Sequence, residues 1–460
     1  MSLIKSISGF RGTIGGKPNE NLTPIDIVKF ASAYGSWLKS KGPGRKKVIV
    51  GRDGRISGPM VESLVEQSLL ALGIDVIHLG LSTTPTVEMA VVFEKADGGI
   101  IITASHNPKQ WNALKLLNEK GEFVSGDEGK TILTLAANED FNYANIDEVG
   151  TLISNADSLD KHIQAILAYP LIDIAAIKVA NFQVVVDAIN SSGAFSVPAL
   201  LNAIGVSNIR VLNGEMTGDF AHNPEPLKEH LTELCNTVVS EKAHLGIAVD
   251  PDVDRLCFVC EDGELFGEEY TLVAVADFIL QNKKGATVSN LSSTRALRDV
   301  TEKYGCSYFA SAVGEVNVVT KMKNENAVIG GEGNGGIIVP DLHYGRDALI
   351  GIALFLTHLA KSKMTASALR ASYPAYFMSK KKMDLDANIS LEKIFTTLEA
   401  KFSAYPINKE DGFKIDFENE WVHLRSSNTE PIIRIYTEAH SQSAADKLAE
   451  EIIAIIGTIK

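Results

Sequence analysis

The sequence predicts an α/β protein with three tandem, related α/β domains, whose sheets are mixed and mostly parallel, and a C-terminal α+β domain. Strand-like and helix-like segments alternate through most of the chain, as in doubly wound sheets. A pattern of strand, polar loop, helix, glycine-marked turn and second strand begins at Val48, Val184 and Ala286, with a period too long for a solenoid. After Ser372 short strands and two amphipathic helices replace it. We therefore expect domains at 1–153, 154–255, 256–370 and 371–460.

Local patterns predict the individual elements. β-branched runs bounded by glycine indicate buried strands, and apolar residues three or four apart indicate helices. In the first domain they place strands at 46–51, 75–79 and 98–102, helices at 58–72 and 84–95, and a less regular segment at 125–157. In the last domain they place strands at 376–385, 412–416, 420–424 and 432–438, and helices at 391–402 and 443–456. This last set predicts a small antiparallel sheet.

Composition excludes several classes of function. The 460-residue chain has a formal net charge of −13, whereas binding to nucleic acid or an anionic membrane needs a basic face. The N-terminus lacks a signal-peptide core, and the longest apolar helical stretch, 348–356, is far shorter than the roughly 20 residues of a membrane span. Cys257 and Cys260 face opposite sides of a predicted strand, so we expect reduced thiols, with Cys235 and Cys306, in a cytoplasmic protein. No heptad pattern indicates an oligomeric state.

Ser105 lies in the first of four polar loops, directly after the strand predicted at 98–102. The carboxyl ends of strands are where open α/β sheets bind ligands. A serine at this place is either a nucleophile or phosphate carrier, or a residue that caps the next turn. Position alone favours the turn, because serine is an ordinary turn and cap residue.

The second loop contains three aspartates, Asp250, Asp252 and Asp254, after the apolar run 245–249. Oxygen ligands at alternate positions suit a hard divalent cation such as Mg²⁺. The alternative is a solvated acidic turn. Three carboxylates this close repel one another unless a cation or an arginine neutralises them. The loop lacks the twelve-residue spacing of an EF-hand.

The third and fourth loops have the composition of ligand-binding turns. Residues 330–336 are rich in glycine, and their polar side chains, Glu332 and Asn334, suit a pair of sugar hydroxyls; the alternative is a flexible turn. Residues 425–431 and the next strand supply an arginine fork, hydroxyls and an amide that suit a phosphate dianion; the alternative is a hairpin with a surface arginine. The residues of this fourth group are Arg425, Ser427, Asn428, Thr429 and Arg434.

Together the four loops resemble the motifs of the α-D-phosphohexomutase family, over the whole length of the chain. TASHNP is similar to the family's phosphoserine loop, DPDVDR to its metal loop, GEGNGG to its sugar loop and RSSNTEP to its phosphate loop. The resemblance implies three α/β domains and a C-terminal domain around a central cleft.

The resemblance also implies roles for single residues. Ser105 would carry a phosphate and, with the three aspartates, ligate Mg²⁺. Glu332 and Asn334 would contact sugar hydroxyls, and the fourth group would hold the non-reacting phosphate. The residues implied to serve the reacting phosphoryl group, as catalytic groups or as cations, are Arg11, His106, Lys115 and Arg255. From residue type alone, Lys115 is more readily a surface charge.

The implied reaction is an isomerisation by phosphoryl transfer. Ser105 would donate its phosphate to a hexose monophosphate, and a glucose or hexosamine 1,6-bisphosphate would be the intermediate or activator. Many family members have a serine where this chain has Asn334, and some phosphomannomutases and phosphoglucomutases carry a histidine near 313–317, where this chain has none. The run 429–439 resembles phosphoglucosamine mutases more, so the resemblance favours conversion of glucosamine 6-phosphate to glucosamine 1-phosphate. The alternatives are a mutase of mixed specificity for glucose and mannose phosphates, a catalytically silent phosphosugar-binding protein and a metal-dependent phosphatase.

Overall fold

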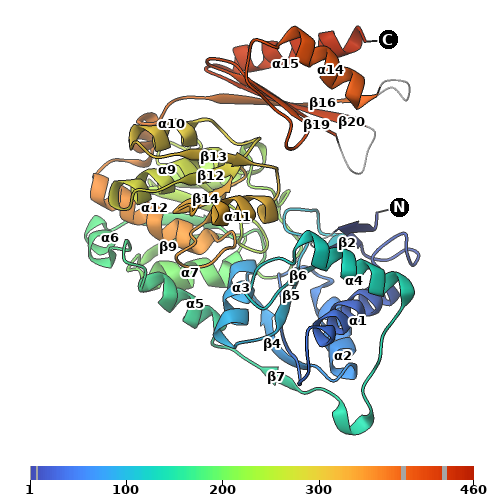
Figure 1. The fold of residues 1–460 in the computed structure, drawn as a ribbon. Coiled ribbons are helices and arrows are strands. Elements are labelled where there is room, and N and C mark those ends of the chain that lie inside the picture. The colour runs from blue at the N-terminus through green and yellow to red at the C-terminus, as the bar shows by residue number, and fades with distance from the viewer. Residues whose placement is uncertain (1, 7–8, 385–389, 427–431, 460) are drawn as a thin grey trace. The chain divides into compact units, whose positions relative to one another are not determined.

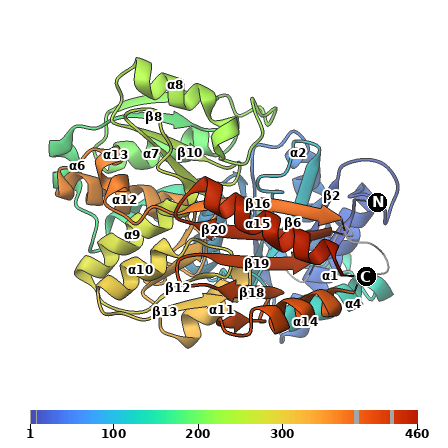
Figure 2. The ribbon, with the colours of Figure 1, turned by 90° about the horizontal axis from the view of Figure 1, so that it is seen from above.

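The computed structural model describes residues 2–6, 9–384, 390–426 and 432–459, and its elements follow the predicted alternation (Figures 1 and 2). The chain divides into two compact units. One comprises Met1–Thr271 and Gly335–Ser367, and the other comprises Leu272–Asn334 and Ala368–Lys460. No helix among the described residues is long and apolar enough to cross a membrane.

The first sheet has the strand order β1-β2-β6-β5-β3-β4-β7. β5, β3, β4 and β7 are parallel neighbours, and β6, β2 and β1 extend the sheet through antiparallel pairs. The strands are β1 (Ile4–Ser6), β2 (Gly9–Thr13), β3 (Lys47–Arg52), β4 (Asp75–Leu81), β5 (Gly98–Ile102), β6 (Trp111–Leu117) and β7 (Leu152–Ser154). Helices α1 (Pro24–Ser40), α2 (Gly58–Ala71) and α4 (Gly126–Asn138) cover one face, and α3 (Thr84–Phe93) covers the other (Figure 1). Their apolar side chains belong to two separate core clusters, one on each face.

The segment 125–157 is more regular than its sequence suggested. Helix α4 begins at a capping box, in which the side chain of Ser125 accepts a hydrogen bond from the N–H of Glu128 and the Glu128 side chain accepts one from the N–H of Ser125. Only Gly129, Ile132 and Ala136 of this helix are buried. So thin an apolar stripe gives a weak helical signal, which is why the prediction was wrong here. A 3₁₀ turn (Ile146–Glu148) precedes β7.

The second sheet has the order β11-β10-β8-β9, in which only β10 and β11 are antiparallel. The acidic loop therefore connects the two strands of a hairpin. The elements are β8 (Gln183–Asp187), β9 (Asn208–Leu212), β10 (Leu245–Val249), β11 (Leu256–Cys260), α5 (Ser158–Leu167), α6 (Ile174–Ala180), α7 (Gly193–Ala203), a 3₁₀ turn (Lys228–His230) and α8 (Thr232–Ser240). Cys257 and Cys260 are buried free thiols in β11, whereas the free thiols Cys235 and Cys306 are half-buried.

In the second unit, β12 (Thr287–Asn290) lies between and parallel to β13 (Tyr308–Ser311) and β14 (Ile329–Glu332). Its helices include α10 (Ala296–Lys303) and α11 (Glu315–Asn324). The remaining elements of this part of the chain are α9 (Glu268–Asn282), β15 (Gly336–Ile338), α12 (Ala348–Ser362) and α13 (Ala366–Ala371). The glycine run was predicted as a loop, but 330–332 belong to β14. Gly330 is required there because a Cβ would lie 2.4 Å from Sδ of Met322 and 2.9 Å from the Val288 carbonyl oxygen.

The last sheet is antiparallel, as predicted, with the order β16-β20-β19-β18-β17. Its strands are β16 (Phe377–Asp384), β17 (Ile407–Asn408), β18 (Phe413–Asp416), β19 (Trp421–Ser426) and β20 (Ile432–Ala439). Helices α14 (Leu391–Lys401) and α15 (Gln442–Gly457) cover one face and share its apolar core (Figures 1 and 2).

Candidate active site

Ser105 follows β5 in a left-handed backbone conformation with φ 49°, and it is only 3% exposed. Few residues other than glycine adopt this conformation, and it is enriched where side chains are aimed at a functional site. The N–H of Ser105 donates to Oγ1 of Thr103 at 2.9 Å. Its hydroxyl donates to Oδ2 of Asp250 at 2.7 Å. The structure therefore brings the predicted serine and the acidic loop together.

Asp250, Asp252 and Asp254 are fully buried, and one oxygen from each lies within 4.8 Å of the others. Burial and the two neighbouring carboxylates raise the pKa of Asp250 well above its usual range. Oδ1 of Asp252 and Oδ1 of Asp254 have no hydrogen-bond partner among the described residues. Buried acceptors are normally satisfied, and carboxylate oxygens are ligands of hard cations. These residues therefore fit a bound divalent metal ion.

The turn that holds the aspartates depends on Val253. Its φ of 62° is unusual for a β-branched residue, and its N–H donates to the Asp250 carbonyl oxygen at 3.0 Å. The N–H groups of Asp254 and Arg255 donate to Oδ1 of Asp250 at 3.1 and 3.0 Å. The chain thus folds back over one carboxylate, and this tight turn gathers the alternate aspartates.

Two buried cations lie against the acidic loop. Nζ of Lys115, on β6, is 2.7 Å from Oδ2 of Asp252 and 3.2 Å from Oδ2 of Asp254. Burial lowers the pKa of Lys115, but the two carboxylates outweigh burial and raise it overall. Lys115 is therefore not the surface charge that its residue type suggested. Arg346 places a guanidinium nitrogen 2.7 Å from Oδ2 of Asp254.

Of the other residues predicted near the serine, Arg11 and His106 are half-buried and Arg255 is buried. Arg11 donates to Oδ1 of Asn107 at 2.9 Å, and burial lowers the pKa of Arg11. Nδ1 of His106 is 3.4 Å from Oγ of Ser105. Burial, together with the nearby charges of Arg255 and Arg11, lowers the pKa of His106 to about 2, so its ring is neutral. The guanidinium of Arg255 forms an ion pair with Glu225 at 3.2 Å.

The second unit contains the predicted sugar and phosphate residues. Glu332 is 4% exposed, and its Oε1 accepts from Nδ2 of Asn290 at 2.8 Å and from the N–H of Gly314 at 3.0 Å. Arg425 lies directly opposite Arg434 in the β19–β20 ladder. Like charges opposite each other are unfavourable, and an anion relieves that repulsion. Ser427, Asn428 and Thr429 lie outside the described residues, and Asn334 follows the end of β14.

Known proteins match the chain along nearly its whole length. Residues 4–143, 160–263 and 267–376 match alpha/beta/alpha domains I, II and III of phosphoglucomutase/phosphomannomutase, and residues 380–455 match its C-terminal domain. A phosphoglucomutase/phosphomannomutase of Thermococcus kodakarensis is 37% identical over 95% of this chain and 96% of its own length. The chain belongs to the α-D-phosphohexomutase family. It is therefore an isomerase of that family.

Other phosphohexomutases extend the comparison. A phosphoglucosamine/phosphogalactosamine mutase of Sulfurisphaera tokodaii is 32% identical over 99% of both chains. The crystal structure of a phosphoglucomutase/phosphomannomutase family protein from Burkholderia thailandensis has a TM-score of 0.86 at 24% identity, over 99% of this chain and 97% of that one. This likeness supports the fold of three α/β domains and a C-terminal domain.

Arg55 organises the serine loop of this phosphohexomutase, and sequence reasoning missed it. Its guanidinium donates to the carbonyl oxygens of Pro108 at 2.8 Å, Trp111 at 3.0 Å and Asn107 at 2.7 Å, and to that of Ser105. Its Nε is 3.0 Å from Oδ2 of Asp53, and both side chains are fully buried. One cation therefore binds four carbonyl groups of the segment 105–111.

A signal for Arg55 was present in the sequence. The run GRDGR ends the strand at 46–51, and in parallel sheets the carboxyl ends of neighbouring strands meet at one edge. Thr84 is a second omission, since its hydroxyl donates to Oδ2 of Asp252 at 2.6 Å. Its signal is weaker, because a threonine at a helix start is ordinarily a cap.

We expect Arg55→Met to lower the free energy of unfolding by about 3 to 5 kcal/mol, because it leaves Asp53 as an unpaired buried charge. The loop carbonyls also lose their donor, so turnover falls with stability. Arg55→Lys keeps a charge beside Asp53 but lacks the fork, and its effect is intermediate. Urea unfolding of these variants beside Arg210→Met, a change at an exposed arginine, measures this. Equal stability of Arg55→Met and wild type would contradict it.

A second buried charge network lies in the first unit around Asp347. Its Oδ2 is 2.9 Å from Nε2 of His162 and 3.3 Å from Nε2 of His343. Nδ1 of His343 is 3.4 Å from Oε2 of Glu88. Burial lowers the pKa of His343, but the two carboxylates prevail and raise it to about 10. This imidazole is therefore a buried cation at neutral pH.

The His343 cation makes stability depend on alkaline pH. A raised folded pKa means that its contribution is complete below the unfolded pKa of about 6.5 and is lost as pH rises toward 10. We expect His343→Gln to remove about 2 kcal/mol of stability at pH 6 and to flatten the decline between pH 6.5 and 10. Urea unfolding at both ends of this range tests it, with the exposed His440→Gln as control. An unchanged slope in His343→Gln would refute it.

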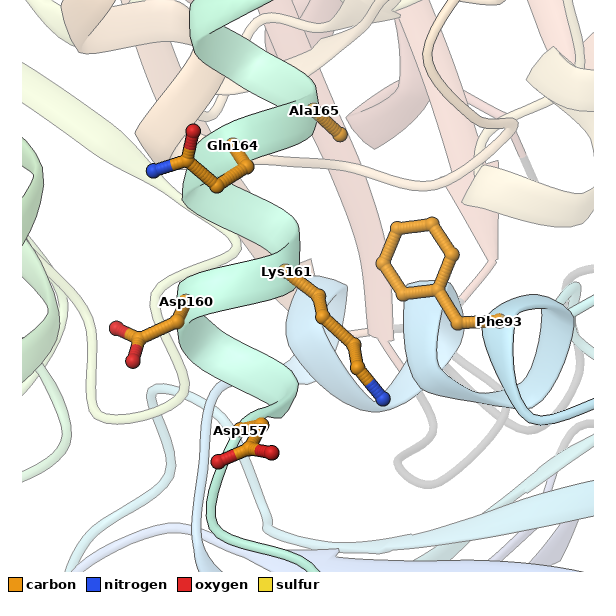
Figure 3. A pocket seen from close by; sticks show the side chains of 6 residues that line it. All are labelled: Phe93, Asp157, Asp160, Lys161, Gln164 and Ala165. Atoms are coloured by element: carbon orange, nitrogen blue, oxygen red, sulfur yellow. The ribbon is translucent and has the colours of Figure 1, made fainter.

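A surface pocket on the first unit lies apart from the predicted residues. Phe93 and Lys161 face each other across it from α3 and α5 (Figure 3). The rest of its lining is Asp157, Asp160, Gln164 and Ala165. Nζ of Lys161 is 2.7 Å from Oε1 of Glu94, so this cation serves a surface ion pair. None of the predicted catalytic or metal-binding residues lines this pocket.

Proposed function

We propose that the protein interconverts hexose 6-phosphates and hexose 1-phosphates through a phosphoserine at Ser105 and a hexose 1,6-bisphosphate intermediate. The observation that carries the proposal is the 2.7 Å contact between the Ser105 hydroxyl and Asp250, inside a buried set of three carboxylates. A protein that only binds phosphosugars needs neither a hydroxyl nor a metal site at that place. We further propose that the predicted segments 1–153, 154–255, 256–370 and 371–460 each contribute one of the four loops.

Phosphoryl transfer requires positioning and neutralisation of charge. A Mg²⁺ ion bound by Asp250, Asp252, Asp254 and the phosphate oxygens on Ser105 would supply Lewis-acid stabilisation of the transferring group. Lys115 and Arg11 add positive charge near the serine, and neutral His106 packs beside its oxygen. The sugar oxygen bonds to phosphorus and gives up its proton as the P–O bond to Ser105 breaks, and Oγ of Ser105 takes up a proton to become a hydroxyl. In the second half-reaction the hydroxyl of Ser105 gives up that proton and takes the other phosphate from the bisphosphate, whose sugar oxygen is protonated as it leaves.

Residues of the second unit serve as substrate contacts in this proposal. Glu332 and Asn334 bind sugar hydroxyls, and Arg255 is a further proposed substrate contact. The non-reacting phosphate is held by Arg425, Ser427, Asn428, Thr429 and Arg434. The register of Arg425 opposite Arg434 supports this role, because it places two arginines on the same face of adjacent strands, where both can contact one dianion.

We propose glucosamine 6-phosphate and glucosamine 1-phosphate as the substrate pair. A relative of Methanopyrus kandleri that bears the name "Probable phosphoglucosamine mutase" is 33% identical over 98% of this chain, which supports this choice. A mutase of mixed specificity for glucose and mannose phosphates is the second candidate. It is favoured by the higher identity, 37%, of the Thermococcus kodakarensis relative named phosphoglucomutase/phosphomannomutase.

The test is kcat/KM for glucosamine 1-phosphate, glucose 1-phosphate and mannose 1-phosphate, with inorganic phosphate measured in the same reactions. The proposal expects isomer formation without matching phosphate release, and the highest kcat/KM for the amino sugar. Phosphate as the main product would indicate a phosphatase, and no product would indicate a binding protein. Mass spectrometry of the purified protein checks for a phosphate on Ser105.

A further inference from the structure

Two consecutive backbone amides in the second unit bind carboxylates from two different loops. The N–H of Val313 donates to Oδ2 of Asp411 at 2.9 Å, and the N–H of Gly314 donates to Oε1 of Glu332 at 3.0 Å. Gly314 is the N-cap of α11 and has φ 114°, a conformation that favours glycine. The positive end of the helix dipole stabilises both carboxylates. The proposed sugar residue and Asp411 are thus held side by side.

Asp411 also contacts the arginine of the proposed phosphate loop. Nε of Arg425 lies 2.8 Å from Oδ2 of Asp411, the same oxygen that accepts from Val313. The next residue, Gly412, has φ 82°, and a Cβ there would lie 2.2 Å from the Leu424 carbonyl oxygen and 3.2 Å from Cγ of Arg425. The loop carrying Asp411 therefore packs directly on the Arg425 side chain.

A hydrogen bond also holds the backbone of Asp411. Its carbonyl oxygen is 2.7 Å from Nε2 of His423, and Nδ1 of the same ring is 2.9 Å from the Ser292 hydroxyl. Burial, together with the charges of Lys414 and Arg425, lowers the pKa of His423 to about 4, so the ring is neutral near pH 7. It can then donate to Asp411 through one nitrogen and accept from Ser292 through the other.

The Arg425–Asp411 ion pair is only a weak stabilising contact. The two side chains are 22% and 24% exposed, and ion pairs at such solvent-screened sites contribute little to stability. Its consequence is geometric. The ion pair places the guanidinium beside Asp411 without a hydrogen bond at Nε, and its terminal nitrogens are the ones that bind phosphate oxygens in pairs.

We propose that Asp411 is a positioning residue, which sets Arg425 for the non-reacting phosphate and links it through Val313 and Gly314 to Glu332. The inference rests on the proposed function, in which Arg425 and Glu332 contact one phosphosugar. Adjacent amides fix the separation of their two carboxylate partners. The sugar contact and the phosphate contact therefore keep a constant spacing, which suits a ligand that must bind in two orientations.

The experiment compares wild type, Asp411→Ala, Asp411→Asn, Arg425→Ala and the double variant Asp411→Ala/Arg425→Ala. The matched control is Glu410→Gln, which alters the neighbouring exposed carboxylate. We expect Asp411→Ala to raise KM for glucosamine 1-phosphate about 10-fold with kcat within about 2-fold, because the phosphate contact is made equally in ground and transition states. Asp411→Asn keeps an acceptor for Val313 but loses the charge, and we expect an increase of about 3-fold.

The double variant separates positioning from a structural role. If Asp411 acts through Arg425, adding Asp411→Ala to the Arg425→Ala variant raises KM by less than about a further 2-fold. Fully multiplicative effects, or an unchanged KM in both Asp411 variants, would overturn the proposal. Asp411→Asn decides the question if Asp411→Ala does not fold.

Binding measurements keep this inference distinct from the proposed function. Titration calorimetry with inorganic phosphate and with glucosamine 1-phosphate needs no turnover. We expect both ligands to bind Asp411→Ala about 10-fold more weakly than wild type. If wild type bound phosphate but isomerised no hexose phosphate, the proposed function would fail, and the comparison of affinities would still decide the role of Asp411.

Discussion

Ser105→Ala is expected to lower hexose phosphate isomerisation by at least about 10⁴-fold, the scale of loss when a covalent nucleophile is removed. Alanine cannot carry the phosphate, and no neighbouring hydroxyl replaces the contact that Oγ makes with Asp250 at 2.7 Å among the described residues. Substrate still binds, because its proposed contacts lie in Glu332 and Arg425. Coupled isomerisation assays measure the first effect, and titration with glucosamine 1-phosphate measures the second.

A matched control for this change is Ser196→Ala. Ser196 is also fully buried, but its hydroxyl only donates to the Ser192 carbonyl oxygen within helix α7. We expect this variant to keep nearly full activity. Wild-type turnover in Ser105→Ala, or phosphate still found on that variant by mass spectrometry, would show that the phosphate carrier lies elsewhere.

Asp252→Asn is expected to reduce turnover by about 10² to 10³-fold at saturating Mg²⁺, the range that loss of one transition-state charge contact typically costs. Oδ1 of Asp252 is a buried oxygen without a partner among the described residues, and its Oδ2 already receives Lys115 and Thr84. The change therefore removes charge from the proposed metal ligands with little change of shape. It also removes half of the charge that holds Lys115.

Thermal unfolding provides a readout of the metal site that does not depend on turnover. A ligand at about 100 times its Kd adds roughly 2.7 kcal/mol to the stability of the state that binds it. We expect Mg²⁺ to raise Tm of wild type, chelation to reverse this, and Asp252→Asn to lose most of the shift. Asp262→Asn, at an exposed carboxylate after β11, should keep it. A full Mg²⁺ shift in Asp252→Asn would argue against the proposed ligands.

Local patterns predicted the strands that precede the serine and the three aspartates, and both strands are present as β5 and β10. These strands belong to different sheets, so the alternation of strands and helices did not predict the contact between Ser105 and Asp250. The antiparallel sheet of the last domain was also predictable, because short strands and two amphipathic helices have distinct periods. Helix α4 was missed because so few of its residues are buried.

Sequence patterns could not predict the contacts between residues that lie far apart in the chain. In the sequence, Arg55 resembles an ordinary arginine of a turn. In the folded protein, carbonyl groups of the segment 105–111 surround its guanidinium. Residue type alone favours a surface charge for Lys115, but β6 places it beside Asp252 and Asp254. Asp411 belongs to no recognised sequence motif, and its proposed role rests on the loop that packs on Arg425.

Residue patterns in the chain were enough to predict four motifs, their order and the family, because each motif concentrates reactive residue types within a few positions of a predicted strand. Which charges are buried together, and which cation neutralises which carboxylate, followed only from the folded arrangement. Burial and distance govern those interactions, and neither is a local property of the chain. The Ser105 hydroxyl contacts a carboxylate because the fold places Asp250, 145 positions away in the chain, 2.7 Å from it.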